Sequence, residues 1–210
     1  MAFFVGVEAT RTPWCDPSTA PKSLQPLLES FPMTLDDLKM LVRSVPDFPS
    51  PGILFRDITT LIAHGEGLAA CVDHLAERAR AADAELIAGM EARGFIFGAA
   101  VAARMGLGFL PVRKPGKLPV KTIGIDYALE YGRDRLEIDP TIIREGQRVV
   151  IVDDLIATGG TALAAAELLR QTGAAVHHAL FVIDLPDLHG AERLRGAGLT
   201  VDALMDFPGH

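Results

Sequence analysis

The four consecutive β-branched residues Val149 to Val152 constrain the fold of this chain more than any other sequence feature. A strand with apolar side chains at every position must be covered on both faces, which happens in the middle of a parallel sheet. An alanine-rich segment that reads as a helix follows at residues 160–171 and can cover one of these faces. The sequence therefore predicts the α/β class, with a doubly wound, mostly parallel sheet.

Further strands and helices alternate along the chain. Short apolar runs predict strands at residues 86–90, 109–112, 176–183 and 199–204. Apolar spacing of three and four predicts a helix at 65–82 and a short helix capped by Thr34, and the segments between strands predict helices at 94–105 and 188–195. A strand, a helix and a second strand in this order form a parallel pair with a right-handed crossover.

Residues 114–142, between the two halves of this pattern, predict a β-hairpin that projects from the sheet. In residues 123–131, large apolar or aromatic side chains occur at every second position, and a turn is expected at Gly132 to Asp134. An inserted hairpin near the carboxyl ends of the strands is a candidate lid.

The chain divides into an irregular extension, 1–33, and one domain, 34–210. The extension has no sustained period and carries five prolines, at positions 13, 17, 21, 26 and 32. It lacks the pattern of a signal peptide or a transit peptide. An alternative is that Met33 is the natural start and that the preceding residues are an artefact.

Composition excludes several classes of protein. The net charge is −7 and the pI about 5.3, whereas proteins that coat nucleic acid need cationic faces, so no nucleic-acid partner is expected. Cys15 and Cys71 cannot form a disulfide framework and lack metal-ligand spacing, which favours a reducing, cytoplasmic location. No apolar stretch approaches the length of a membrane helix, so no membrane partner is expected.

The segment after the β-branched run, Asp153 to Thr161, has the character of an anion-binding loop. Gly159 and Gly160 let backbone N–H groups converge on a phosphate, Thr158 and Thr161 add hydroxyl donors, and a helix begins there. The carboxylates of Asp153 and Asp154 would repel a phosphate but can accept hydrogen bonds from sugar hydroxyls. A phosphorylated sugar fits this segment, and the alternative is an ordinary strand-to-helix turn.

Residues 149–161 resemble the phosphoribosyl diphosphate (PRPP) motif of the type I phosphoribosyltransferase family. Other stretches are similar to its adenine phosphoribosyltransferase branch, in the same order: Asp47–Thr59, Glu91–Gly98, Val112–Pro119 and Tyr127–Gly132. The resemblance covers about residues 34–206. It implies five parallel strands, a small hood mainly at 34–60, a flexible lid at about 114–142, and a homodimer.

In the hood, Pro49 and Pro51 fix a stiff turn and Gly52 permits a tight bend. The resemblance implies that the backbone groups of Leu54 and Arg56 bind the edge of adenine and that Phe55 stacks on its face. The alternative for Phe55 is a plain core position.

The resemblance also implies roles for charged residues. Four basic residues would bind pyrophosphate: Arg93, Arg113, Lys114 and Lys117. A cis peptide is expected just before Arg93. Taken alone, residues 113–117 are typical of a solvated loop, and Glu130 of a solvent-facing carboxylate. The resemblance makes Glu130 the catalytic lid residue, which meets N7 of the base.

The implied reaction converts adenine and PRPP to AMP and pyrophosphate, a purine salvage step. The ribose 5-phosphate would bind Ala157, Thr158, Gly159, Gly160 and Thr161. Asp153 and Asp154 would hold the ribose hydroxyls, and Mg²⁺ would be carried by PRPP, with no protein-only metal site. Two alternatives stay open: transfer to another base such as xanthine or orotate, and a regulator that senses nucleotides and binds RNA or DNA.

Overall fold

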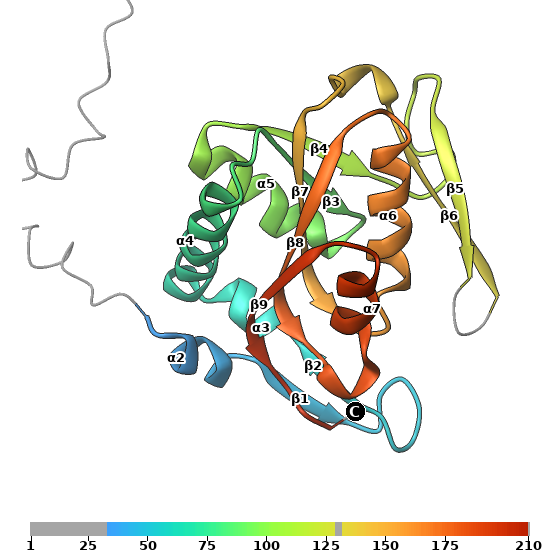
Figure 1. The fold of residues 1–210 in the computed structure, drawn as a ribbon. Coiled ribbons are helices and arrows are strands. Elements are labelled where there is room, and N and C mark those ends of the chain that lie inside the picture. The colour runs from blue at the N-terminus through green and yellow to red at the C-terminus, as the bar shows by residue number, and fades with distance from the viewer. Residues whose placement is uncertain (1–32, 129–131, 210) are drawn as a thin grey trace, which may run out of the picture. The chain divides into compact units, whose positions relative to one another are not determined.

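The computed structural model describes residues 33–128 and 132–209, which belong to one compact unit, and its core is a five-stranded parallel sheet (Figure 1). The five strands are β3 (Leu86–Met90), β4 (Gly108–Val112), β7 (Arg148–Ile156), β8 (Ala175–Asp184) and β9 (Thr200–Asp206). Every predicted strand of the sheet is present. β7 is longer than predicted, because it continues past the β-branched run to Ile156. It pairs with β8 from Arg148 to Ile156, with a register shift between Arg148 and Val150.

The strand order, β4-β3-β7-β8-β9, creates a crevice at one edge of the sheet. From β3 the chain passes outward to β4, and from β7 it passes outward in the opposite direction to β8. The connections that leave β3 and β7 therefore run in opposite directions along the sheet. In doubly wound sheets, ligands bind in the crevice outside the carboxyl ends of such a pair of strands. The fold places the segments that follow β3 and β7 side by side.

Helices cover both faces of the sheet (Figure 1). α4 (Gly65–Ala81) and α5 (Arg93–Met105) pack on one face, and α6 (Gly160–Arg170) and α7 (Gly190–Gly196) on the other. In β7, Val149 and Ile151 belong to the core under α6, whereas Val150 and Val152 belong to the core under α4 and α5. This two-sided burial explains the uninterrupted β-branched run. The four helices begin and end within two residues of the predicted bounds.

The N-terminal part of the described chain builds a small two-stranded sheet. α2 (Leu35–Met40) begins with the predicted cap: Thr34 accepts a hydrogen bond from the backbone of Asp37, whose carboxylate accepts one in return. Antiparallel strands β1 (Arg43–Pro46) and β2 (Leu54–Asp57) follow, and then α3 (Thr59–Ala63). These three short elements were not predicted, since four or five residues carry too little periodicity to be recognised.

The predicted hairpin is present as β5 (Ile123–Ala128) and β6 (Arg133–Ile138). Its turn was placed too late in the sequence: Ala128 pairs with Arg133 and Tyr127 with Asp134, so Arg133 and Asp134 lie in a strand. Tyr127 and Asp134 are therefore opposite each other across the hairpin. Two short 3₁₀ helices, η3 (Pro140–Ile142) and η4 (Pro186–Leu188), complete the elements of residues 33–128 and 132–209.

The predicted extension lies, except for Met33, outside the described residues, as do Cys15, Glu130 and Tyr131. Within the described part of the chain, no helix combines the length and apolar character needed to cross a membrane.

Candidate active site

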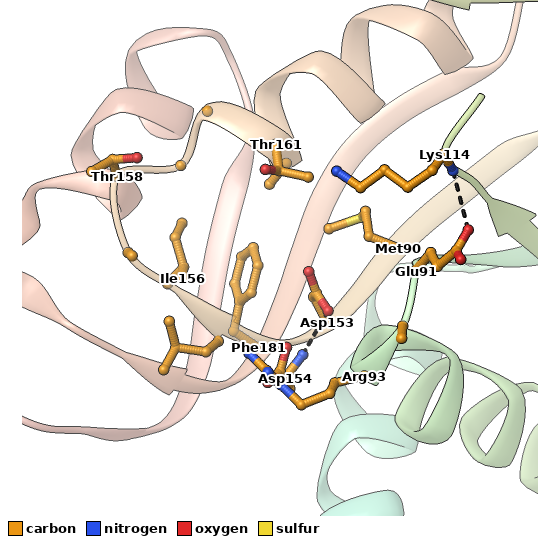
Figure 2. A pocket seen from close by; sticks show the side chains of 16 residues that line it. Met90, Glu91, Arg93, Lys114, Asp153, Asp154, Ile156, Thr158, Thr161 and Phe181 are labelled. Atoms are coloured by element: carbon orange, nitrogen blue, oxygen red, sulfur yellow. Dashed lines mark hydrogen bonds and ion pairs between the residues drawn. The ribbon is translucent and has the colours of Figure 1, made fainter. Parts of the chain in front are cut away.

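A cavity of about 300 Å³ opens at the carboxyl ends of β3 and β7, in the crevice that the strand order creates (Figure 2). Three segments line it: residues 90–93 at the end of β3 and beyond it, Lys114 after β4, and residues 153–162 from β7 to α6, with Phe181 of β8. The predicted sugar-phosphate segment and two of the predicted cationic residues, Arg93 and Lys114, therefore share one cavity.

The glycine-rich loop forms one wall of this cavity, between β7 and α6. Gly159 has a φ of 73°, in the left-handed region that favours glycine, and α6 begins at the next residue. Thr158, Gly160 and Thr161 also line the cavity. The first turn of an α-helix leaves backbone N–H groups without intrahelical partners, and residues 160–162 of this turn line the cavity, an arrangement that suits an anion.

Gly190, the first residue of α7, supports the loop from behind. A Cβ atom on Gly190 would overlap the carbonyl oxygen of Ala157 and lie 2.8 Å from the backbone nitrogen of Gly159. The backbones of α7 and the loop are therefore in direct contact, and a methyl group cannot be added without moving one of them. Sequence reasoning gave Gly190 no role, because nothing local marks a contact with a loop about thirty residues earlier.

The sequence resemblance implies PRPP as the substrate, and Gly190→Ala is expected to lower kcat/KM for PRPP by about 10²-fold, since a shift of about 1 Å in a positioning element has an effect of that size. Gly196→Ala is a matched control, because Gly196 lies in the same helix and a Cβ there meets nothing within 4 Å. Steady-state kinetics measures both variants, and circular dichroism checks that they fold. Equal activity of the two variants would show that the loop tolerates displacement.

The two consecutive acids occupy different environments at the end of β7. Asp154 is buried, and its carboxylate accepts a hydrogen bond from Nε of Arg93, whose side chain is 54% exposed. The carboxylate of Asp153 accepts a hydrogen bond of 2.9 Å from the backbone nitrogen of Asp154. Burial and the neighbouring Asp154 carboxylate raise the pKa of Asp153 well above its usual range. Hydrogen-bond donors from a ligand would stabilise the charged form of Asp153.

Glycine also makes room for these acids. A Cβ atom on Gly94, at the start of α5, would lie 2.5 Å from Oδ1 of Asp153. The peptide bond between Glu91 and Ala92 is cis. The expected cis bond, directly before Arg93, would lie one position later in the chain. The missing side chain of Gly94 lets the start of α5 lie against the end of β7.

The structure separates the four predicted pyrophosphate ligands into two groups. Arg93 and Lys114 line the cavity, whereas Arg113 and Lys117 do not. Nε of Arg113 donates to Glu91 over 3.1 Å, and the same carboxylate accepts a 3.1 Å hydrogen bond from the backbone nitrogen of Lys114. The hydrogen bonds from Arg113 and then Lys114 hold the pKa of Glu91 below its usual value. Glu91 therefore ties Arg113 and the backbone of Lys114 to the end of β3.

The predicted adenine residues Leu54, Phe55 and Arg56 lie on β2 and are not among the residues that line the cavity. The rings of Phe55 and Phe48 pack edge to face, with centroids 5.1 Å apart. Phe55 is half-buried, so it is not a plain core position. The guanidinium of Arg56 donates to Ser44 Oγ over 2.6 Å and to the carbonyl oxygen of Pro208 over 3.1 Å. These contacts fix the side chain of Arg56 while its backbone belongs to the strand.

Comparison with known proteins identifies the family. The sequence pattern of the phosphoribosyl transferase domain matches residues 59–195. An adenine phosphoribosyltransferase from Novosphingobium aromaticivorans is 89% identical over 178 residues, which is 85% of this chain and 100% of that relative. The chain belongs to the adenine phosphoribosyltransferase family.

Two solved adenine phosphoribosyltransferases support this result at the level of fold. The enzyme from Thermoanaerobacter pseudethanolicus has a TM-score of 0.79 and 46% identity, and the match covers 83% of this chain and 100% of that one. The enzyme from Saccharomyces cerevisiae, solved with adenine and an imino-altritol bisphosphate, has a TM-score of 0.76 and 39% identity over 81% and 98% of the two chains. The predicted family, fold class and transferase activity are confirmed.

Sequence reasoning gave no role to seven further lining residues of the cavity: Met90, Glu91, Ala92, Leu155, Ile156, Ala162 and Phe181. Met90 is the last residue of β3, and Glu91 follows it. Because β3 pairs with β7, the residues at this strand end are expected to lie next to the crevice, and this position could have identified them. Phe181 is buried on β8 opposite Asp153 and looks like an ordinary core residue in the sequence.

Proposed function

We propose that the cavity binds PRPP and that this chain transfers its phosphoribosyl group to adenine, giving AMP and pyrophosphate. The observation that carries the proposal is the meeting of a glycine-rich helix N-terminus, two acids and two cations at the β3–β7 crevice. In the proposed complex, residues 157–161 bind the 5-phosphate through backbone N–H groups and the hydroxyls of Thr158 and Thr161. Asp153 and Asp154 accept hydrogen bonds from the ribose hydroxyls.

Pyrophosphate is the leaving group, and its negative charge grows as the bond to C1 of the ribose breaks. Arg93 and Lys114 are the cations that line the cavity, so we assign them the direct contacts with this charge. Although desolvation opposes it, the hydrogen bond to Asp154 raises the pKa of Arg93, which keeps the guanidinium charged. Arg113 and Lys117 remain predicted ligands, and Arg113 would need to leave Glu91 in order to reach the ligand.

For adenine, we propose the backbone groups of Leu54 and Arg56, with Phe55 against the face of the base. Leu54 and Arg56 are two residues apart on β2, so their N–H and C=O groups face the same edge of the strand. Pairing with β1 and the anchored side chain of Arg56 fix these groups. N9 of adenine attacks C1 from the side opposite to pyrophosphate, and closure of the segment 114–142 excludes water, which would hydrolyse PRPP.

The residues of the cavity fit a Mg²⁺ ion that PRPP carries. Hard carboxylate oxygens, such as those of Asp153 and Asp154, suit this ion, and the substrate itself supplies phosphate and hydroxyl oxygens. Among residues 33–128 and 132–209 there is no group of three or more His, Cys, Asp or Glu side chains placed to hold a metal. When bound, Mg²⁺ would neutralise part of the pyrophosphate charge. Asp153 and Asp154 would orient the ribose hydroxyls beside it.

We also propose a homodimer and a cytoplasmic location. The family resemblance supports the first proposal, and the second is supported by the scarcity of cysteine, with Cys71 a buried free thiol.

We assign proton transfer at N7 of the base to Glu130, which lies outside the described residues. Glu130→Gln is expected to lower the single-turnover rate of AMP formation by about 10²-fold, with a smaller change in the affinity for PRPP, since it removes the proton acceptor and keeps the size of the side chain. Saturating adenine and PRPP remove binding and product release from this measurement. Glu77→Gln, an exposed change on α4, is the control. An unchanged single-turnover rate in Glu130→Gln would indicate that Glu130 is a solvent-facing carboxylate without a role in proton transfer.

A further inference from the structure

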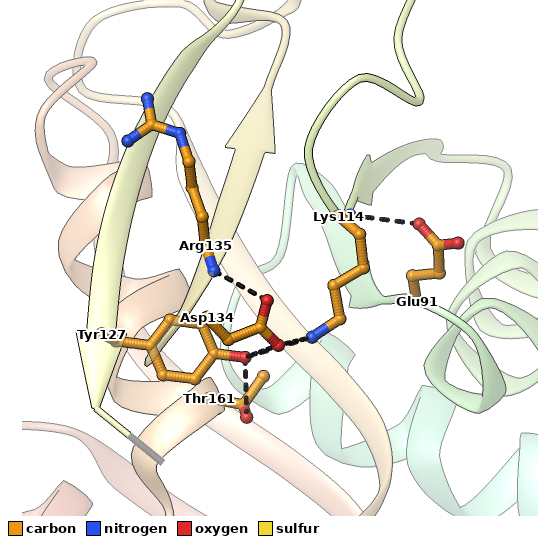
Figure 3. Close-up of polar contacts among 6 residues, drawn as sticks. All are labelled: Glu91, Lys114, Tyr127, Asp134, Arg135 and Thr161. Atoms are coloured by element: carbon orange, nitrogen blue, oxygen red, sulfur yellow. Dashed lines mark hydrogen bonds and ion pairs between the residues drawn. The ribbon is translucent and has the colours of Figure 1, made fainter. Parts of the chain in front are cut away.

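Four polar side chains from three parts of the chain form one hydrogen-bonded network at the edge of the cavity (Figure 3). Nζ of Lys114 is paired with Oδ2 of Asp134 and lies 3.4 Å from the hydroxyl of Tyr127. The Tyr127 hydroxyl donates to the same oxygen of Asp134 over 3.2 Å. Thr161 Oγ1 donates to the Tyr127 hydroxyl over 3.4 Å. We call these four residues the Lys114 network.

The network connects the hairpin to two walls of the cavity. Lys114 and Thr161 line the cavity, whereas Tyr127 and Asp134 are cross-strand partners in β5 and β6 and are not lining residues. Lys114 follows β4, and Thr161 lies in the first turn of α6. The hairpin thus holds one cation of the proposed pyrophosphate site and one hydroxyl of the proposed 5-phosphate site at the same time.

Counting hydrogen-bond donors shows what the network leaves for a ligand. An ammonium group has three donors, and two of those of Lys114 are directed to Asp134 and Tyr127. One donor remains. A lysine side chain has many rotamers, and two partners on a paired strand restrict it to few of them. The hydrogen bond from Lys114 also lowers the pKa of Asp134, so the pair stays ionised.

We propose that Asp134, assisted by Tyr127, is a positioning residue that directs the Lys114 ammonium toward a phosphoryl group of the substrate. The inference rests on the proposed function, because it takes the cavity to be the PRPP site. Asp134 does not touch the reacting atoms in this proposal. It acts through Lys114, and Tyr127 transmits the position of the hairpin to Thr161.

The opposite role for Asp134 makes a prediction of opposite sign. If the carboxylate merely competed with phosphate for Lys114, or only added negative charge beside an anion site, its removal would strengthen PRPP binding. If Asp134 positions Lys114, its removal weakens PRPP binding despite that electrostatic gain. The direction of the change therefore separates the two roles.

Asp134→Asn is expected to raise KM and Kd for PRPP about tenfold and to lower kcat, since Lys114, which contacts the growing pyrophosphate charge, loses a charge-assisted partner. KM for adenine is expected to change by less than about twofold. Tyr127→Phe removes one hydroxyl and is expected to raise KM for PRPP by about threefold. Calorimetric titration with PRPP in the absence of adenine gives Kd independently of turnover.

Asp126→Asn is the matched control. Asp126 lies on the same hairpin and pairs with Arg135 over 3.1 Å, its side chain is 65% exposed, and this side chain forms no hydrogen bond or ion pair with the Lys114 network. The same change of charge there is expected to leave KM for PRPP within about twofold of the wild-type value.

A PRPP affinity that is unchanged or stronger in Asp134→Asn would overturn the proposal, and so would equal losses in Asp126→Asn and Asp134→Asn. Failure of the wild-type protein to form AMP would instead contradict the proposed function, and the calorimetric titration would still test Asp134.

Discussion

Asp153→Asn combined with Asp154→Asn is expected to lower kcat/KM for PRPP by at least about 10³-fold, because the proposed hydrogen bonds from two ribose hydroxyls to charged acceptors are lost together. Asparagine keeps the size of each side chain and one carbonyl oxygen. It removes the negative charge and replaces one acceptor oxygen by an NH₂ group, which only donates hydrogen bonds. The change also deprives Arg93 of its ion partner, which frees the guanidinium from the wall of the cavity.

Stopped-time assays of AMP formation give the rate, and calorimetric titration with PRPP separates binding from chemistry. Asp36→Asn combined with Asp202→Asn is the control, since both residues are exposed and the change of net charge is the same. Thermal unfolding of both double variants shows whether the fold persists. If PRPP binding and turnover of the Asp153/Asp154 variant stayed near the wild-type values, the two acids would have a structural role only.

Adenine is expected to be converted at least about 10³ times better than hypoxanthine, since the wrong base leaves two buried polar groups unsatisfied. The 6-amino group of adenine donates a hydrogen bond and its N1 accepts one, whereas hypoxanthine and guanine present the reverse at both atoms. Backbone groups fixed in a strand cannot rotate to exchange donor for acceptor. The pairing of β2 with β1 and the contacts of Arg56 hold Leu54 and Arg56 in this way.

The measurement is a panel of bases with PRPP and Mg²⁺, with nucleotide formation followed for each base. Guanine serves as a second 6-oxopurine and is expected to be rejected to a similar degree. Efficient use of hypoxanthine, guanine or orotate would contradict the assignment of Leu54 and Arg56 to the edge of the base.

The sequence alone determined the elements that have a strong local signal. The β-branched run of β7 demanded burial on both faces, and both cores take alternate residues from it. The contiguous segment from Asp153 to Thr161 carried its acids, glycines and hydroxyls within nine positions, so its chemistry could be recognised before the fold was known. In the hood, the prolines and Gly52 indicated a stiff turn, but the short strands on either side of it had too few residues to show a period.

Which distant residues meet depends on how the elements pack in three dimensions. Arg93 pairs with Asp154 because strand order places the end of β3 beside the end of β7, although the two residues are 61 positions apart. The basic residues that look alike at 113–117 separate because Glu91 binds Arg113, whereas Asp134 holds Lys114. Gly190 lies against the glycine-rich loop because α7 packs on the same face of the sheet as α6. These contacts depend on crossover direction and side-chain packing between elements, and the periodicity within one element encodes neither.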